Sequence, residues 1–202
     1  MIAIIDYDIG NVSAVANMLQ RLGVPCRVTA QVDEVLQAER IILPGNGAFD
    51  ACMRNLRATG LIPILEQQVL QRGVPLLGIC VGAQMLGSRS AEGSEPGLGW
   101  IDMRVERFPS LPGLRIPHMG WNRVQGVQPA HPLARGMVAD ARFYFVHSYF
   151  MLPQNPSDIL LQTHYGIDFA AGVARGHIAG VQFHPEKSHR FGKQLLAAFA
   201  GG

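Results

Sequence analysis

The chain has 202 residues, a length that favours one domain and allows a full hydrophobic core. Apolar residues make up 48% of the chain and charged residues 16%, so the composition excludes a disordered protein. The net charge is +2, and lysine and arginine form no run, which excludes the basic surface typical of nucleic-acid-binding proteins.

The lack of targeting signals and the pattern of cysteines indicate the cellular compartment. No apolar run is long enough to cross a membrane, and no basic side chain precedes Arg21, so we expect neither a membrane anchor nor a secretory signal. The three cysteines include no CxxC pair, which argues against disulfides and against a cysteine-based zinc site. The sequence therefore predicts a cytoplasmic protein without a metal centre.

The first half of the chain alternates short apolar segments with helical patterns. We expect strands at Ile2–Ile5, Cys26–Thr29, Arg40–Leu43 and Val74–Ile79. Helices are expected at 12–22, Val32–Ala38, Ile62–Arg72 and Val81–Leu86. Nearly continuous apolar strands that alternate with helices are typical of a parallel sheet covered on both faces.

The second half differs, because proline and glycine interrupt it at 92–99 and 108–117. We interpret the short apolar segments that follow as antiparallel or mixed strands, at Met119–Val124, Phe143–Phe150, Ile159–His164, Phe169–Ala174 and Ile178–Phe183. A last helix is expected to begin near Ser188, a candidate N-cap. The predicted fold class is therefore α/β, with a mostly parallel central sheet flanked by helices and additional antiparallel or mixed strands in the C-terminal half. No linker divides the chain, so residues 1–202 are expected to form a single domain.

Cys80 is the first candidate for chemistry, because it lies where an apolar strand is expected to turn into a helix. Gly78 and Gly82 flank it at the spacing of a nucleophile elbow, whose glycines permit a sharp turn. A helix N-terminus would also favour the thiolate. From these neighbours alone, a nucleophile and a buried structural cysteine are equally good interpretations.

His184 and Glu186 supply the groups that a nucleophilic cysteine needs. They follow the apolar segment 178–183, and in an extended chain residues two apart project to the same side. Pro185 between them excludes a helical conformation for His184. Taken alone, the His-Pro-Glu segment is as consistent with a solvated turn, but together with Cys80 it indicates an acyl-transfer triad.

The segment Pro44-Gly-Asn-Gly47 follows a third apolar strand. Two glycines around one residue allow backbone N–H groups to point into a cleft, which is how an oxyanion hole is built beside a nucleophile. Without such a neighbour, the segment is an ordinary turn signal.

Two segments resemble the signatures of class I (triad) glutamine amidotransferases: Gly78-Ile-Cys-Val-Gly-Ala-Gln84 and Gly180-Val-Gln-Phe-His-Pro-Glu186. Further segments resemble one branch of that family, the glutaminase subunits of imidazole glycerol phosphate synthase. These segments are 6–11, 44–49, 117–122, 144–149 and 184–188, and the resemblance extends from residue 2 to about residue 199.

The resemblance implies a chemistry and a site. Cys80 would attack the side-chain amide of glutamine, His184 would transfer the proton as ammonia leaves, and Glu186 would orient His184. Backbone groups at Asn46 and Val81 would form the oxyanion hole, and no cofactor is implied. Residues that match segments holding the glutamine are Gly45, Gly47, Gln84, His147, Ser148 and Tyr149.

The resemblance also implies a partner. The ammonia would pass to a (β/α)₈-barrel cyclase subunit, bound as a heterodimer, that makes imidazole glycerol phosphate and AICAR in histidine biosynthesis. Positions that match the partner-facing surface are Asn11, Trp121 and Lys187. Neither nucleic acid nor a membrane is expected as a partner.

The chain departs from the usual pattern of this branch at Asp8, Asn46, Val81 and Ala83. None of these changes removes a catalytic group, but they leave a second acceptor open, namely a sugar amidotransferase of a surface-polysaccharide pathway. Two further alternatives are a non-catalytic docking subunit and another cysteine-elbow enzyme such as a peptidase. The intact Cys80, His184 and Glu186 argue against the first, and the His-Pro-Glu signature argues against the second.

Overall fold

The computed structural model describes residues 1–201. The strands of the first half of the chain form a parallel sheet, as the apolar segments predicted, and one strand from the C-terminal half joins it. The parallel strands lie in the spatial order β2 (Cys26–Thr29), β1 (Ile2–Ile5), β3 (Arg40–Gly45), β4 (Leu76–Cys80) and β12 (Ile178–Val181). Every residue of β1, β4 and β12 is buried, which explains why these strands read as continuous apolar runs.

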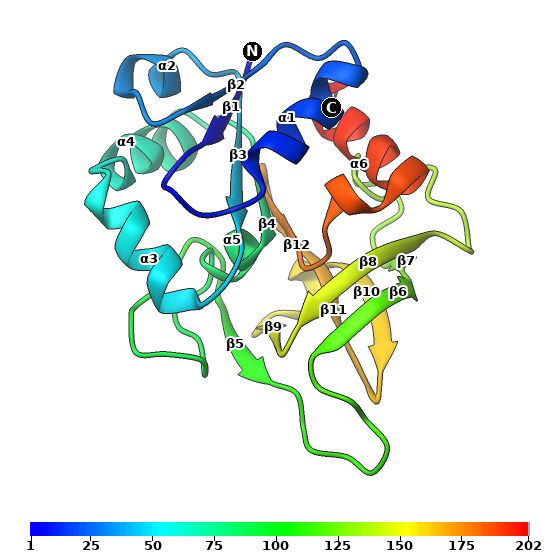
Figure 1. Ribbon diagram of the computed structural model, residues 1–202. Helices are drawn as coiled ribbons and strands as arrows, with labels where there is room; N and C mark the ends of the chain where they lie inside the picture. The colour runs from blue at the N-terminus through cyan, green and yellow to red at the C-terminus, as the bar shows by residue number, and fades with distance from the viewer. Residues whose placement is uncertain (202) are drawn as a thin grey trace.

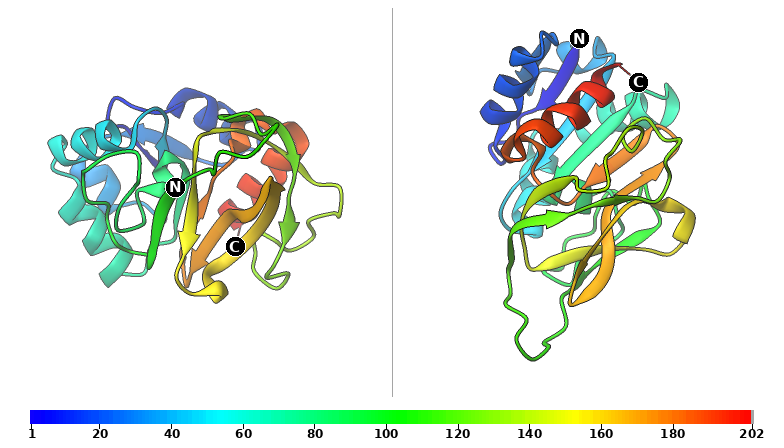
Figure 2. Two further views of the ribbon diagram at one scale, coloured as in Figure 1. Left: turned by 90° about the horizontal axis from the view of Figure 1, so that it is seen from below. Right: turned by 90° about the vertical axis from the view of Figure 1, so that its right-hand side faces the viewer.

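Helices cover both faces of this parallel half (Figures 1 and 2). On one face, α1 (Val12–Arg21) packs against α6 (His189–Gly201). On the other lie α2 (Val32–Leu36), α3 (Phe49–Ala58) and α4 (Ile62–Glu66), which continues into a π-helical turn at Gln67–Gln71. Within residues 1–201, no helix is long and apolar enough to span a membrane.

Antiparallel strands extend the sheet beyond β12. Next to it lie β11 (Ile167–Arg175), β10 (Ile159–Tyr165) and the short β7 (Gln125–Gly126), while β9 (Tyr149–Pro153) joins β11 to β5 (Met103–Arg107). A separate two-stranded sheet pairs β6 (His118–Arg123) with β8 (Arg142–His147). The predicted fold class, a mostly parallel α/β sheet with additional strands in the C-terminal half, is confirmed.

Apart from short segments of two or three residues, helix α3 and strand β5 were the elements that were not predicted. In α3, the apolar side chains Phe49, Met53 and Leu56 recur at helical spacing and are buried, but the segment follows the 44–47 turn directly. In β5, Met103 and Val105 are buried while their neighbours are not, which is the alternation of a half-buried strand.

The single strand predicted at Phe143–Phe150 is wrong. The extended segment is interrupted at Ser148 and forms two strands. Strand β8 pairs with β6, whereas β9 pairs with β5 and β11. The sequence stays apolar on both sides of Ser148 because each strand buries side chains, such as Phe145 in β8 and Phe150 in β9. The change of sheet therefore leaves no signal in the local pattern.

The last helix begins at His189, near the predicted residue. The carbonyl of Ser188 accepts a hydrogen bond from the N–H of Gly192, as the carbonyl of an N-cap does. Its hydroxyl, however, donates to the carbonyl of His184 at 2.6 Å and accepts from the N–H of Tyr144 at 3.0 Å. Through these two hydrogen bonds, Ser188 links strand β8 to the turn that contains His184.

Candidate active site

The predicted site residues come together where β3, β4 and β12 end. In an open parallel sheet, ligands bind outside the carboxyl ends of the strands, and these three strands are neighbours. A pocket of about 240 Å³ opens there. Its lining includes Asn46, Gly47, Cys80, Val81, Gln84, Glu92, Pro117, Val146, His147, Ser148 and Tyr149.

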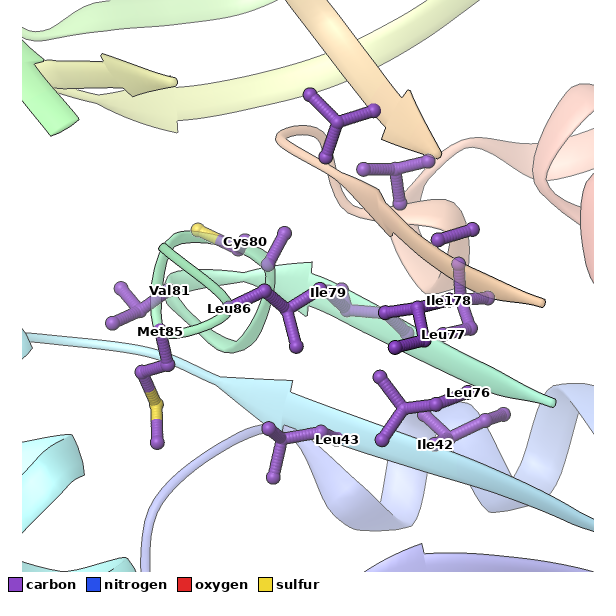
Figure 3. Packing of buried hydrophobic residues seen from close by; sticks show 14 of the residues in the cluster. Ile42, Leu43, Leu76, Leu77, Ile79, Cys80, Val81, Met85, Leu86 and Ile178 are labelled. Atoms are coloured by element: carbon purple, nitrogen blue, oxygen red, sulfur yellow. The ribbon is translucent and has the colours of Figure 1, made fainter. Parts of the chain in front are cut away.

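Cys80 occupies a strained turn between β4 and α5 (Val81–Gln84). Its backbone angles, φ 54° and ψ −115°, are rare for a residue with a side chain. In Figure 3, its sulfur points away from the apolar side chains of Ile42 and Leu43. The turn thus holds the thiol at the pocket, at the edge of the buried core.

Close packing of α5 on the strands makes this turn possible. A Cβ atom on Gly82 would lie 2.0 Å from the carbonyl oxygen of Leu43, and one on Gly45 would lie 2.2 Å from the backbone N of Gly82. Both positions therefore require glycine. Gly45, which the resemblance assigned to substrate binding, is buried beneath α5 and does not line the pocket.

Replacing Gly82 by alanine should therefore destabilise the fold. The new methyl group would overlap backbone atoms of β3, which have no rotamer to change, so we expect a loss of about 3 kcal/mol or more in the free energy of unfolding. Thermal or chemical denaturation measures it. Gly126→Ala is the matched control, because its Cβ would meet only Ala134, at 3.4 Å from its Cβ and 3.9 Å from its carbonyl oxygen. Equal stability of the two variants would contradict this account of the turn.

His184 and Glu186 form a buried pair beside Cys80. The Nδ1 atom of His184 lies 2.8 Å from Oε1 of Glu186, and their side chains are 3% and 1% exposed. The Nε2 atom of His184 and Oε2 of Glu186 are buried without a hydrogen-bond partner among residues 1–201. An imidazole held by one nitrogen, with the other free, is the geometry of a proton-transferring base.

The electrostatics of this pair favour a charged imidazole. Burial lowers the pKa of His184, but the Cys80 sulfur and the Glu186 carboxylate favour the protonated ring and together raise the pKa to about 10. At neutral pH, His184 is therefore an imidazolium that faces the sulfur of Cys80. A pair of this kind is typical of cysteine nucleophiles.

Two side chains orient the loop 44–47. The hydroxyl of Tyr7 donates to the carbonyl of Pro44, and the thiol of Cys52 lies 3.5 Å from the carbonyl oxygen of Asn46. Burial raises the pKa of Cys52 to about 11, so the thiol keeps its proton and can donate it. Because the C=O and N–H groups of a trans peptide point in opposite directions, the N–H of Gly47 points away from Cys52.

Two buried histidines contribute to the pocket wall: His147 lines the pocket, and His118 contacts His147. Nδ1 of His147 lies 2.7 Å from the carbonyl oxygen of Tyr149, and its Nε2 lies 3.0 Å from Nδ1 of His118. Burial lowers the pKa of His147 to about 3 and that of His118 to about 4, so both rings are neutral. A carbonyl only accepts, so His147 donates from Nδ1 and accepts at Nε2 from His118. Nε2 of His118 then accepts from the amide of Asn122 at 3.3 Å.

Three pocket residues were missed by the sequence reasoning: Glu92, Pro117 and Val146. Glu92 is the informative one, because it brings a carboxylate to the pocket, where its Oε2 also accepts a hydrogen bond from the N–H of Phe49 at 2.9 Å. It lies in a segment whose prolines and glycines indicate only a loop. A single glutamate there carries no signal of its own.

The three residues predicted to face a partner lie outside the pocket on the surface. Trp121 is 47% exposed and meets the ring of Tyr144 edge-on at 6.1 Å, while the Lys187 ammonium lies 5.9 Å from the centre of the same ring. Asn11 is exposed at the start of α1, which packs against the turn Pro185–Lys187. The exposed Met119 lies on the same strand as Trp121.

Residues 1–201 contain no group of three or more histidine, cysteine, aspartate or glutamate side chains arranged to hold a metal ion. All three cysteines are free thiols.

The model of the family "Glutamine amidotransferase class-I" matches residues 3–200. The chain is 52% identical over 199 residues to imidazole glycerol phosphate synthase subunit HisH 2 of Pseudomonas aeruginosa, and the match covers 98% of each chain. It is 50% identical to subunit HisH of Bdellovibrio bacteriovorus, with 99% of each chain covered. Among solved structures, a glutamine amidotransferase superposes with a TM-score of 0.75 at 18% identity, over 99% of both chains. A chain of PurLQS from Thermotoga maritima gives 0.74 at 17% identity, over 98% of this chain and 96% of that one.

Proposed function

The chain belongs to the class I glutamine amidotransferase family, and we propose that it is the glutaminase subunit of an imidazole glycerol phosphate synthase, acting in histidine biosynthesis. The observation that carries this proposal is the identity of 43% to 52% with subunits of that name over nearly their full length. The geometry supports it, because the Cys80 thiol lines the pocket and the buried His184–Glu186 pair lies beside that thiol, as amide hydrolysis through a thioester requires.

The proposed reaction has two halves. The thiolate of Cys80 attacks the side-chain amide carbon of glutamine, and the oxyanion forms beside N–H groups of Val81 and of the loop at Asn46 and Gly47. His184 donates its proton as the C–N bond breaks, so that ammonia leaves and a glutamyl thioester remains. His184 then accepts a proton from the water that hydrolyses the thioester, while Glu186 holds the ring in place.

The pocket wall offers groups for the two charged ends of glutamine. Glu92 is the carboxylate suited to the α-ammonium group, and Ser148 and Tyr149, whose backbone N–H groups are suited to the α-carboxylate, also line the pocket. Gln84 presents its Oε1 atom, since its Nε2 atom is bonded to the carbonyl of Tyr149 and to Gln182. We assign Gly47 and His147 to the shape of the pocket, and Gly45 to the packing of α5.

We further propose that the ammonia acceptor is a (β/α)₈-barrel cyclase subunit and that it binds the surface around Asn11, Trp121 and Lys187. Trp121 is an exposed aromatic residue, and such residues are enriched at the centres of protein interfaces. We also take residues 1–202 to act as one amidotransferase domain in the cytoplasm. The continuous buried core supports the first assignment, and the free thiols support the second.

Lys187→Ala should weaken binding to the cyclase subunit. This chain has 15 arginines but only two lysines, and a compact ammonium at this place is suited to pair with a carboxylate of the partner. We expect about a tenfold higher Kd, which corresponds to about 1.4 kcal/mol, and a weaker dependence of binding on salt. Lys193→Ala, on the exposed side of α6, is the control. If titration calorimetry gave the same Kd for both variants, Lys187 would have no role in binding the cyclase subunit.

A paired assay tests the function itself. The purified chain, mixed with the cyclase subunit from its own genome and the cyclase substrate, should release glutamate and form imidazole glycerol phosphate in equal amounts. Glutamate release with a sugar acceptor, and none with the cyclase, would favour the polysaccharide alternative. The sequence relatives do not favour that alternative. No glutamate release with either acceptor would contradict the glutaminase assignment.

A further inference from the structure

Gln182 has no role in the reaction described above, yet its side chain contacts the nucleophile. It is fully buried at the end of β12, two residues before His184. Its Nε2 atom lies 3.9 Å from the sulfur of Cys80. We propose that Gln182 donates a hydrogen bond that stabilises the thiolate of Cys80, and that Gln84 is the positioning residue that fixes the direction of this bond. The proposal rests on the proposed function in that it takes Cys80 as the nucleophile.

The orientation of the side-chain amide of Gln182 can be deduced from the backbone carbonyl group of Tyr149. The carbonyl oxygen of Tyr149 lies 2.7 Å from Nδ1 of His147 and 3.2 Å from the amide of Gln84. A carbonyl only accepts, so the group that Gln84 presents to it is the NH₂ end. The same NH₂ group lies 3.0 Å from the side chain of Gln182, which must therefore present its oxygen there. The NH₂ end of Gln182 is then left facing the sulfur of Cys80.

The backbone of Gln182 gives the side chain little freedom to leave this place. Its N–H donates to the carbonyl of Ala171 at 2.9 Å, which extends the pairing of β11 with β12 by one residue. Reversing the amide would place two NH₂ groups opposite each other, between Gln182 and Gln84, and would turn an oxygen toward the sulfur. Both contacts would then be repulsive, so a single orientation is favoured.

A donor at this place favours the charged form of the sulfur. The thiolate accepts a hydrogen bond more strongly than the thiol does, and in a buried site this difference is large. His184 already supplies a positive charge, but its proton is used in the reaction. An amide proton is never transferred, so Gln182 can stabilise the thiolate before it attacks glutamine and again when hydrolysis of the thioester releases it.

The rate of alkylation of Cys80 by iodoacetamide as a function of pH tests the proposal, since only the thiolate reacts. Peptide mass spectrometry separates Cys80 from Cys26 and Cys52. In Gln182→Met, which keeps the volume and removes the donor, the midpoint of the profile should move upward by about one pH unit, so that alkylation below it is about tenfold slower. Gln182→Glu keeps the acceptor for Gln84 but turns an anionic oxygen toward the sulfur, and its midpoint should move further.

The control is Gln68→Met, because Gln68 is an equally buried glutamine whose amide has no hydrogen-bond partner among residues 1–201 and which lies outside the pocket. Its profile should match that of the unmodified chain. A wild-type profile in Gln182→Glu would overturn the proposal even where Gln182→Met fails to fold. A lower kcat in folded Gln182→Met without a shift of the profile would also overturn it, since a merely structural role predicts that result. Failure of the proposed function is seen separately, as the absence of glutamate release by the unmodified complex.

Discussion

Cys80→Ala is expected to abolish glutamine hydrolysis while leaving ammonia-dependent synthesis by the complex intact. Only the thioester half of the proposed reaction needs the thiol, and the cyclase receives free ammonia in either case. Removing the nucleophile of a covalent mechanism costs roughly 10⁴–10⁶ in kcat. Glutamate release measures the loss, and imidazole glycerol phosphate formed from added ammonium salt measures what remains.

The variant should also keep its fold, which makes this comparison meaningful. Cys80 lies at the edge of the core and its side chain makes no contact that alanine would turn into a large cavity, so the midpoint of thermal unfolding should change little. Cys26→Ala is the matched control for loss of a thiol elsewhere. Glutamine-dependent turnover near the wild-type rate in Cys80→Ala would place the nucleophile on another residue.

The parallel half of the fold could be predicted from sequence because all of its strands except β2 are buried along nearly their whole length. Arg40–Leu43 and Ile2–Ile5 read as apolar runs, and the helices between them have one apolar face. Helix α3 also has an apolar face, formed by Phe49, Met53 and Leu56, but it was missed because the segment follows the 44–47 turn directly. The break at Ser148 was missed because local hydrophobicity does not say which neighbour a strand pairs with.

The candidate site likewise contains residues that could be predicted from the local sequence and residues that could not. Cys80, His184 and Glu186 lie in segments whose local pattern suggests their chemistry, namely a glycine-flanked elbow and a pair spaced two residues apart at a strand end. The contacts of Glu92 and Gln182 depend on distant parts of the chain. Gln182 reaches a sulfur 102 positions away, and only the pairing of β12 with β4 brings the two together.

His184→Ala should be nearly as harmful as Cys80→Ala, because it removes both the partner of the thiolate and the proton donor for ammonia. Glu186→Gln should be milder, with kcat lowered on the order of 10³–10⁴, since an orienting carboxylate contributes less than the base that it holds. Steady-state glutaminase assays of the two complexes give the ranking. A larger loss in Glu186→Gln than in His184→Ala would reverse the roles assigned to these residues.

The pH profile of Glu186→Gln adds a test that depends on charge alone. Burial lowers the pKa of His184, and the Cys80 sulfur and the Glu186 carboxylate outweigh it, which places the pKa near 10. A neutral amide at position 186 removes one of the two opposing charges, so the pKa must fall and the imidazolium must lose its proton at a lower pH. Because the departing ammonia needs that proton, the alkaline limb of kcat/KM should lie near pH 10 in the unmodified complex and at a lower pH in the variant. An alkaline limb that stays in place in Glu186→Gln would show that the buried carboxylate does not hold the charge on His184.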